Sequence, residues 1–490
     1  MVAGFRSGVA GLEFQGRSLG KRGVALNTSA RNHERLLAGL RRDYEALYPH
    51  SREAHARANR VLIDGISHGA RLYAPYPFRI TAANGAYVTD LDGHKITDFW
   101  QGHYSNILGH NPAVIREALI AELGRGSGLQ TGLPDERETE FAETLARVVG
   151  AERVRLTTAG TLATMYAIML ARAFTERTLV LKLAGGWHGA NPLALKGVGR
   201  TESGFDKVDS AGVPVSTGDE IIVTRFNDVE QLHQVFRSLG DRIACLILEP
   251  CMGGAGFIHA TAEFMAAARE LTGRYGALLI LDEIITGFRY CAAGVQRLYG
   301  VAPDLSTYGK VIGGGMPLVA VTGRAEIMDL AGGKAKKRVW FNGGTFSSHP
   351  LALLAGKTMI EYLCQHEGEI YPALAAKGDR LRAGVEKVFA DRGILARCTG
   401  HGNGIIGGGS LASIYFPTRE DHSITSAEDF QDPRLCDVTL QEQALKLGLL
   451  LHNVNIVHGL GAISYSHSDG DLDRVCEACD AFALRLLAAH

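Results

Sequence analysis

The chain has 490 residues, with 51 Lys and Arg against 52 Asp and Glu, which gives a formal net charge of −1. This near-neutral balance gives no support to binding of nucleic acid or of an anionic membrane surface. Hydrophobic residues make up 46% and charged residues 21% of the chain, as is ordinary for a globular protein. The length is sufficient for two or three domains with a large buried core.

The N-terminal 33 residues contain several Arg and Gly but no apolar core of a secretory signal. We expect them to form a flexible extension, with a transit-type peptide as the alternative. No segment has the composition of a membrane span. The long uncharged stretch at 399–416 is Gly-rich and contains His401 and Asn403, so it is expected to be a loop followed by a strand.

The eight cysteines follow no disulfide framework. Cys245 and Cys364 lie inside apolar runs, which favours reduced, buried thiols and a cytoplasmic location. Cys476 and Cys479 have the CxxC spacing, but no second pair and no His lies close by. We therefore expect no metal site here and assign both residues to an ordinary C-terminal helix.

The first structured part of the chain is predicted to be a small domain. Apolar residues at helical spacing predict a helix over 34–61 that Pro49 interrupts. Apolar and polar residues alternate over 80–98, which predicts a β-meander with a hairpin turn at Asp92 and Gly93. We assign residues 34–110 to the N-terminal segment of this small domain.

Strands and helices then alternate along the chain from about residue 153. The pattern predicts strands at 154–157, 179–183, 243–249 and 278–282 and helices at 161–173 and 263–275. This rhythm indicates a mostly parallel sheet with helices on both faces, in a large domain over 111–350. Helices at 351–364 and 371–389 open a C-terminal part, residues 351–490, that completes a smaller α/β domain.

The apolar run at 277–281 ends at two acids, Asp282 and Glu283. Open α/β folds bind their ligands at the carboxyl ends of such strands. Lys310 follows in the Gly-rich segment 309–315, where its amine has room to move. A buried acid and a mobile lysine suit pyridoxal phosphate (PLP): the acid keeps the pyridine nitrogen protonated, and the lysine forms a Schiff base and moves the proton. Each residue alone also fits a metal or ribose site, a salt bridge, or a solvated loop.

Two further segments are candidate phosphate sites. Residues 157–161 lie between a predicted strand and a helix, where the backbone N–H groups beside Gly160 and the hydroxyl of Thr161 can bind an anion. The alternative is that Thr158 or Thr161 simply caps the helix. Thr345 follows two glycines, and this loop suits either phosphate binding or a plain turn.

Trp187 and His188 follow the strand at 179–183 and are flanked by glycines. The indole could stack on a flat ligand or pack in the core. His188 could be a polar neighbour of a cofactor or a structural residue. Glu249 ends a buried strand and needs a partner, either an arginine or a ligand amine.

Taken together, the motifs at 281–289 (Leu-Asp-Glu-Ile-Ile-Thr-Gly-Phe-Arg), 303–315, 344–345 and 350–352 resemble the class III PLP-dependent aminotransferases, in particular the glutamate-1-semialdehyde aminomutase branch. The resemblance covers nearly the whole chain from about residue 58. It implies PLP fold-type I, the aspartate-aminotransferase-like α/β fold. Further matching pieces are found at 85–87, 90–93, 107–110, 210–214 and 467–469.

The resemblance also implies roles for residues around the cofactor. Lys310 is similar to the Schiff-base lysine, and Asp282 to the acid that pairs with the pyridinium nitrogen. Trp187 stands where the family has a stacking aromatic residue. Gly160 and Thr161 match the phosphate loop.

Three more residues take their expected roles from the family. Thr345 matches a threonine that reaches the phosphate from the other subunit, so a homodimer with shared sites is implied. Glu249 matches the acid of the family's Glu-Pro strand end. Arg71 matches the arginine that receives a substrate carboxylate, a task that suits a guanidinium group.

The resemblance implies an aminotransferase that moves an amino group between a carboxylate-bearing amino compound and a keto acid or aldehyde, through pyridoxamine phosphate. The alternative is glutamate-1-semialdehyde 2,1-aminomutase activity, and a remote one is a non-catalytic relative. Ala159 and Leu162 replace the family's usual Ser and Glu, and residues 103–105 (His-Tyr-Ser) replace the Trp-Gly-Pro of the mutases. Residues 200–214, however, resemble the mutase lid.

Overall fold

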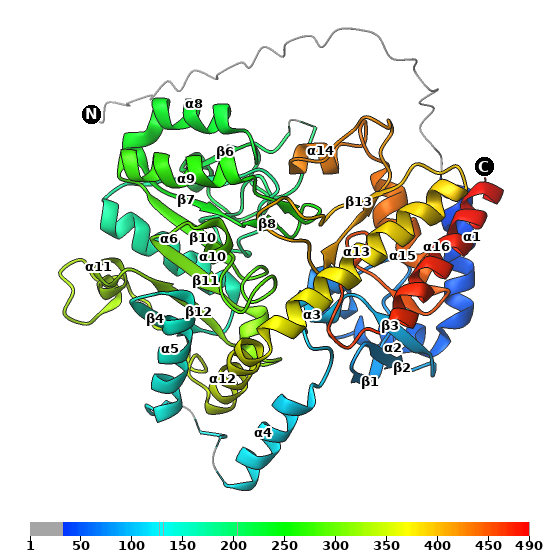
Figure 1. Ribbon diagram of the computed structural model, residues 1–490, viewed down its shortest axis with the longest axis horizontal. Helices are drawn as coiled ribbons and strands as arrows, with labels where there is room; N and C mark the ends of the chain where they lie inside the picture. The colour runs from blue at the N-terminus through cyan, green and yellow to red at the C-terminus, as the bar shows by residue number, and fades with distance from the viewer. Residues whose placement is uncertain (1–32, 127, 131, 203, 490) are drawn as a thin grey trace. The chain divides into compact units, whose positions relative to one another are not determined.

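The computed structural model of the chain describes residues 33–126, 128–130, 132–202 and 204–489 (Figure 1). The predicted N-terminal extension lies outside the described residues, with the exception of His33. That residue is buried, and its Nε2 lies 2.7 Å from a carboxylate oxygen of Asp437. His33, which the sequence assigned to the extension, thus packs against a residue from the C-terminal part of the chain.

A seven-stranded sheet forms the centre of the larger half of the molecule. Its strands run in the order β4 (Arg153–Thr157), β12 (Val319–Gly323), β11 (Leu305–Tyr308), β10 (Leu278–Glu283), β7 (Ile243–Leu248), β5 (Leu179–Leu183) and β6 (Ile221–Thr224). All neighbours are parallel except β12, which is antiparallel to both β11 and β4. The predicted mostly parallel sheet is thus confirmed.

The two faces of this sheet are covered by different helices because successive side chains of a strand point to opposite faces. On β10, Leu279 and Leu281 pack in one core with α8 (Val229–Leu239) and α9 (Ala262–Tyr275). Leu278 and Ile280 pack in another core with α6 (Gly160–Thr175). Burial on both faces explains why these strands are apolar at nearly every position.

A second sheet joins the two ends of the described chain. The predicted meander forms as β1 (Ile80–Asn84), β2 (Tyr87–Asp90) and β3 (Lys95–Asp98), and β16 (Val454–Asn455) adds to β3 in parallel. Figure 1 shows α1 (Glu34–Leu47) and α16 (Asp469–Ala489) side by side near this sheet, where α15 (Leu445–Leu450) also packs against both. The domain boundaries at 110 and 350 stay a prediction.

The helices outside the central sheet follow the predicted segments with small shifts. Pro49 begins a second helix, so the segment 34–61 forms α1 (Glu34–Leu47) and α2 (Pro49–Ala58). Cys476 and Cys479 lie on α16 as expected, whereas Cys364 is exposed, so its predicted burial was wrong. None of the described helices is long and apolar enough to cross a bilayer.

The remaining elements complete the described chain. Its other α-helices are α3 (Gln101–Tyr104), α4 (Ala113–Gly124), α5 (Glu136–Val149), α7 (Val215–Asp219), α10 (Gln296–Tyr299), α11 (Ala325–Met328), α12 (Pro350–Gln365), α13 (Glu367–Asp391), α14 (Ala427–Gln431), α15 (Leu445–Leu450) and α16 (Asp469–Ala489). The short strands are β8 (Cys251–Met252), β9 (Ile258–His259), β13 (Arg397–Cys398), β14 (Leu411–Ala412), β15 (Ile414–Tyr415) and β17 (Gly461–Ala462).

Asp98 at the end of β3 connects the second sheet to the segment that follows it. Its buried carboxylate accepts hydrogen bonds from Nδ2 of Asn455 on β16 (2.7 Å) and from the backbone N–H groups of Trp100 (3.1 Å) and Gln101 (2.9 Å). Nε2 of His110 lies 2.8 Å from the same carboxylate. Burial alone would raise the pKa of Asp98, but these partners, His110 first, hold it below its ordinary value.

We therefore expect Asp98→Ala to lower the free energy of unfolding by about 3 kcal/mol, because it leaves buried donors unpaired. A depressed pKa in the folded state gives stability that is present above the unfolded value of about 3.9 and is lost as the pH falls through the folded pKa. The variant should accordingly lose part of the acid dependence of stability. Urea unfolding between pH 3 and 7, with exposed Asp241→Ala as the control, measures this; equal effects of the two variants would contradict it.

Candidate active site

A cavity of about 260 Å³ lies at the carboxyl ends of five parallel strands, β4, β5, β7, β10 and β11. It is lined by residues 158–161, 164, 187–189, 249, 282, 284, 285, 310 and 316–319. Seven of the nine predicted site residues are among them: Gly160, Thr161, Trp187, His188, Glu249, Asp282 and Lys310. Thr345 and Arg71 are not.

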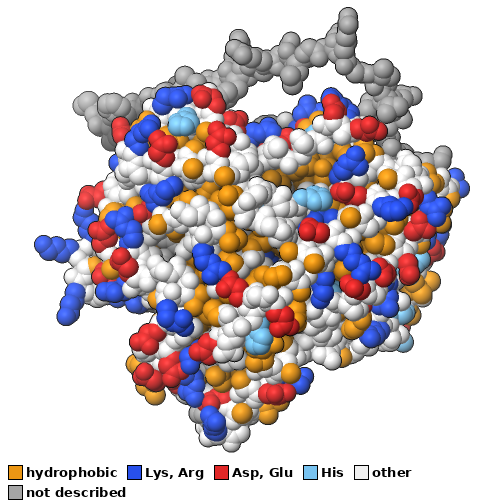
Figure 2. Space-filling model, viewed as in Figure 1, with side chains coloured by type: hydrophobic (Ala, Val, Ile, Leu, Met, Phe, Trp, Pro, Cys, Tyr) orange, Lys and Arg blue, Asp and Glu red, His pale blue; other side chains and the backbone are white. Residues whose placement is uncertain are grey.

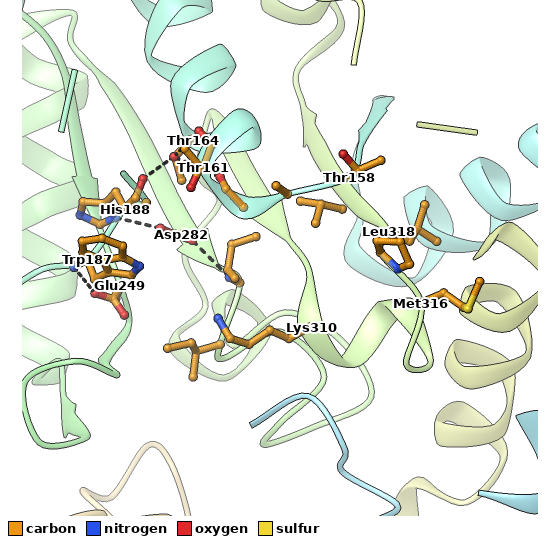
Figure 3. A pocket seen from close by; sticks show the side chains of 17 residues that line it. Thr158, Thr161, Thr164, Trp187, His188, Glu249, Asp282, Lys310, Met316 and Leu318 are labelled. Carbon is orange, nitrogen blue, oxygen red and sulfur yellow. Dashed lines mark hydrogen bonds and ion pairs between the residues drawn. The ribbon is translucent and has the colours of Figure 1, made fainter. Parts of the chain in front are cut away.

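Asp282 is buried at the end of β10, and three hydrogen bonds fix its carboxylate. Oδ1 accepts from the hydroxyl of Thr307 (2.9 Å) and from the backbone N–H of Ile284 (3.2 Å). Oδ2 lies 2.8 Å from Nδ1 of His188. The carboxylate is therefore held in one orientation at the cavity wall (Figure 3).

His188 acts on Asp282 and is not an isolated core histidine. Burial lowers the pKa of His188, although its hydrogen bond and attraction to Asp282 oppose this shift. The neutral imidazole donates from Nδ1, and its Nε2 is buried without a partner among the described residues. The sequence left the role of this residue open, whereas the structure assigns it to the orientation of Asp282.

Lys310 reaches the same cavity from the turn after β11. It is the first residue of η4 (Lys310–Gly313) and has a left-handed φ of +50°. Figure 3 shows its amine pointing toward the wall that carries Trp187 and Glu249. Burial lowers the pKa of Lys310, while Asp282 and Glu249 oppose this shift. A lowered pKa increases the share of neutral amine, which is the form that acts as nucleophile and base.

Among the residues that the structure describes, neither an arginine nor another side chain forms a hydrogen bond or ion pair with Glu249. Its carboxylate accepts from the backbone N–H groups of Trp187 (2.8 Å) and Gly253 (3.0 Å). Burial, with a contribution from the charge of Asp282, raises the pKa of Glu249 to about 7. Of the two partners considered for Glu249, the structure shows no arginine among the described residues; the acid instead binds backbone N–H groups of the loops that follow β5 and β8.

Trp187 is 43% exposed, so the alternative of core packing is wrong for its indole. The loop that carries it lies close to the start of α6. Gly189 has a φ of +82°, and a Cβ at this position would lie 2.5 Å from both Cα and Oγ1 of Thr161. Glycine is thus required for this approach.

The start of α6 presents backbone N–H groups to the cavity. Its N-cap is Ala159, which makes no side-chain cap, so neither Thr158 nor Thr161 has the capping role considered as an alternative. The first helical hydrogen bonds run from the N–H groups of Leu162 and Ala163 to the carbonyl of Ala159. The N–H groups of Gly160 and Thr161 precede them, at the positive end of the helix dipole, which favours an anion.

The two predicted residues outside the cavity lie on exposed segments. Thr345 is exposed, and Gly343 of the same loop accepts a hydrogen bond from Thr157 Oγ1 (3.0 Å) at the end of β4. Arg71 is the exposed last residue of η2 (Gly69–Arg71). Its positive charge acts on His103.

Sequence reasoning missed the unusual backbone of α3. Its residues Gln101, Gly102, His103 and Tyr104 all have left-handed φ values, of 47°, 62°, 57° and 70°. Each of the three non-glycine residues costs about 1 kcal/mol or more in this conformation. The only warning in the sequence was Gly102, which adopts positive φ freely.

The turn α3 packs against η4, which begins with Lys310. The buried guanidinium of Arg289 donates to the carbonyl of Tyr104 and helps to hold the turn in place. Burial lowers the pKa of His103 to about 3, and the charges of His68, Lys310 and Arg71 add to this effect. The charges of Arg71 and of the cavity lysine thus both act on a neutral imidazole.

Known proteins match this chain over most of its length. A family model for class III aminotransferases matches residues 68–431. Glutamate-1-semialdehyde 2,1-aminomutases of Methanosphaera stadtmanae and Laribacter hongkongensis are 34% and 36% identical over 89% and 87% of this chain, and the matches cover 98% and 97% of those enzymes. The structure of an omega-transaminase from Sphaerobacter thermophilus has a TM-score of 0.79 at 30% identity, over 90% of this chain and 97% of its own.

The chain therefore belongs to the class III aminotransferases. It is a PLP-dependent enzyme of this family, a transaminase or an aminomutase, and it has the α/β fold of the family. The resemblance and the fold expected from the sequence are both confirmed.

We expect Gly189→Ala to weaken binding of PLP by about tenfold, or roughly 1.4 kcal/mol, because the added methyl group pushes the loop away from Thr161. Titration of the apoenzyme with the cofactor, followed by absorbance, measures this. Gly150→Ala is the matched control, since Gly150 has a φ of +70° but open space around its Cβ position. Equal weakening in both variants would assign the effect to backbone strain instead of the approach to α6.

Proposed function

We propose that this chain binds PLP in the cavity and uses it to move an amino group on a carboxylate-bearing amino compound. The observation that carries the proposal is the meeting of Lys310 and Asp282, from two neighbouring strands, in one cavity beside the start of α6. When bound, the cofactor supplies an aldehyde for a primary amine and a ring that withdraws electrons from the substrate carbon.

The residues present fit such a group. The oriented carboxylate of Asp282 suits a protonated pyridine nitrogen, and the N–H groups of Gly160 and Thr161 suit a phosphate. The half-exposed indole of Trp187 provides an apolar face for a flat ring. His188 supports this site indirectly by holding Asp282, and Glu249 by holding the backbone of Trp187.

Lys310 is the residue that we assign to proton transfer. Its amine is the basic group of the cavity that can take the proton from the substrate carbon and return it at another carbon. The buried surroundings keep part of the amine neutral, which this step requires. The apolar side chains of Ile284, Ile285 and Leu318 line the same cavity.

Arg71 is proposed to bind the substrate carboxylate. It lies on an exposed segment, and its charge and that of Lys310 both act on His103. A guanidinium group can hold a carboxylate with two parallel hydrogen bonds. The neutral imidazole of His103 leaves this positive charge available to the substrate.

Between the two forms of amino transfer, the relatives favour the aminomutase. Both curated relatives carry that name, and they match almost their entire length to this chain. In the proposed mutase reaction one molecule loses and regains the amino group in the site, so no second substrate is needed.

Transfer between two molecules is the second candidate. Residues 103–105 differ from the Trp-Gly-Pro of the mutases, and they form the end of the strained turn α3 and the residue after it, beside η4. The omega-transaminase of Sphaerobacter thermophilus has a similar fold over nearly the whole chain. The substrate side of the cavity is therefore where the two activities would differ.

We include a homodimer in the proposal, because Thr345 is exposed and requires a second copy if it is to reach a phosphate. Large apolar side chains are exposed near it, namely Ile120, Leu129, Leu133, Trp340 and Phe346. A Cβ at Gly128 would lie 2.7 Å from the side chain of Leu351. The segment that contains Leu129 is therefore a neighbour of the start of α12, which follows Phe346 in the chain. Figure 2 shows apolar side chains reaching the projection formed by α4. Sedimentation of the holoenzyme as a monomer would contradict the dimer.

Replacement of the cavity lysine tests the main proposal. We expect Lys310→Ala to reduce turnover by roughly 10³-fold or more while the protein stays folded, because the general base is lost. Borohydride should fix the cofactor covalently to residue 310 of the wild-type enzyme, as mass spectrometry of peptides would show. Exposed Lys336→Ala should retain full activity. Retained turnover in Lys310→Ala would remove Lys310 from the mechanism.

Replacement of the proposed carboxylate ligand tests substrate binding. We expect Arg71→Ala to raise KM for carboxylate substrates by roughly 30-fold, or about 2 kcal/mol, since a charge-assisted hydrogen-bonded pair is lost. Plain amines of the same length should be affected far less. Steady-state kinetics with matched pairs of substrates, and Arg60→Ala as the control, would show this; equal losses for both kinds of substrate would contradict the role.

A single experiment separates the two candidate reactions. The enzyme is mixed with isotopically labelled glutamate 1-semialdehyde and no other amino acceptor or donor. An aminomutase should convert it fully to 5-aminolevulinate. A transaminase specific for other compounds should release at most one equivalent of deaminated product per active site. Product analysis by mass spectrometry distinguishes these outcomes.

A further inference from the structure

A lysine without a role in the chemistry lies inside the central sheet. Lys182 belongs to β5 (Leu179–Leu183), and its side chain is fully buried. Its Nζ donates to three backbone carbonyls, those of Gly186 (2.9 Å), Ala194 (3.0 Å) and Lys196 (2.8 Å). All three acceptors belong to the segment that follows the strand.

That segment is the Trp187 loop, residues 185–197, which provides Trp187 and His188 to the cavity. Its ends lie together, since the N–H of Gly185 donates to the carbonyl of Gly197 (2.8 Å). Compact loops with neighbouring ends are held by their own interior contacts. Here the interior contact is the ammonium group of Lys182.

The other side of the loop is fixed to α6. The hydroxyl of Thr164 donates to the carbonyl of His188 (2.5 Å), and Nδ2 of Asn191 donates to the same carbonyl (3.0 Å). The N–H of Leu193 donates to Oδ1 of Asn191 (3.0 Å). Lys182 and Thr164 thus hold the loop through different carbonyls, and the carbonyl that Thr164 binds is that of His188.

We propose that Lys182 is a positioning residue for the cofactor: its ammonium group fixes the Trp187 loop in the shape that places Trp187 and His188 at the cavity. The inference rests on the proposed binding of PLP in that cavity. Lys182 does not line the cavity, so its hydrogen bonds reach the site through the loop; its charge also acts on His188.

The chemistry of the side chain explains why lysine suits this position. An ammonium group has three donors, and three carbonyls at 2.8–3.0 Å satisfy them all. Burial lowers the pKa of Lys182 to about 8, while Asp209 and Glu249 favour its charged form. An apolar residue would leave three inward-facing carbonyls of the loop without donors, so the loop would open.

The test compares Lys182→Met and Lys182→Gln with Lys196→Met in the full-length chain. Lys196 lies on the same loop, but its Nζ contacts groups outside the loop, a carboxylate oxygen of Asp206 (2.7 Å) and the carbonyl of Gly218 (3.2 Å). The first readout is the dissociation constant for PLP, measured by equilibrium dialysis. The second is hydrogen exchange of the backbone amides at 185–197, with amides elsewhere as the reference.

We expect Lys182→Met to bind the cofactor at least about tenfold more weakly, to exchange faster at 185–197 and to exchange normally elsewhere. Lys182→Gln, which keeps two donors, should fall between Lys182→Met and wild type, and Lys196→Met should match wild type. If Lys182→Met does not fold, Lys182→Gln decides alone. Unchanged cofactor binding overturns the inference, even if the loop exchanges faster.

Failure of the proposed function gives a different result. In that case the wild-type chain does not bind PLP, but exchange at 185–197 in the three variants still reports whether Lys182 fixes the loop. Equal exchange in all of them, and in the wild type, would overturn the inference on its own.

Discussion

The hydrogen bond between Nδ1 of His188 and the carboxylate of Asp282 connects residues that are 94 positions apart in the chain. A buried carboxylate is costly unless it is paired, and this imidazole supplies the partner with the shortest contact. The same contact fixes the loop after β5 against β10. Because the carbonyl of His188 is bound by Thr164, the start of α6 is fixed as well. His188 thus supports both Asp282, which is proposed to bind the ring nitrogen, and the start of α6, which is proposed to bind the phosphate.

Burial shifts three titratable groups of this cavity, His188, Lys310 and Glu249, toward their neutral forms. It lowers the pKa of His188 and of Lys310, and it raises the pKa of Glu249 to about 7. The cavity therefore carries less charge near neutral pH than its residue types suggest. A doubly charged phosphate in it would be bound mainly by backbone N–H groups, which keep their polarity at every pH.

Much of the fold and most of the candidate site could be predicted from the sequence. The strands β7 and β10 are continuous apolar runs, and residues after five parallel strands must converge at one edge of the sheet. The hydrogen-bond partners and the burial of individual side chains could not be predicted, because they depend on packing between segments that are distant in the sequence. Glu249 is bound by backbone N–H groups, and Cys364 is exposed at the end of a helix that is otherwise largely buried. The left-handed turn α3 is imposed by its surroundings, against the preference of three of its four residues.

The addition of β16 to β3 has a consequence for how the protein is made. Ribosomes release the chain from its N-terminus, so the three-stranded meander emerges first and its fourth strand almost last. All seven strands of the central sheet are available once β12 has been synthesised. In the smaller sheet, the edge of β3 stays unpaired until β16 has been synthesised. We expect the unpaired edge of β3, and not the cofactor site, to be the part of the nascent polypeptide that most needs protection by chaperones.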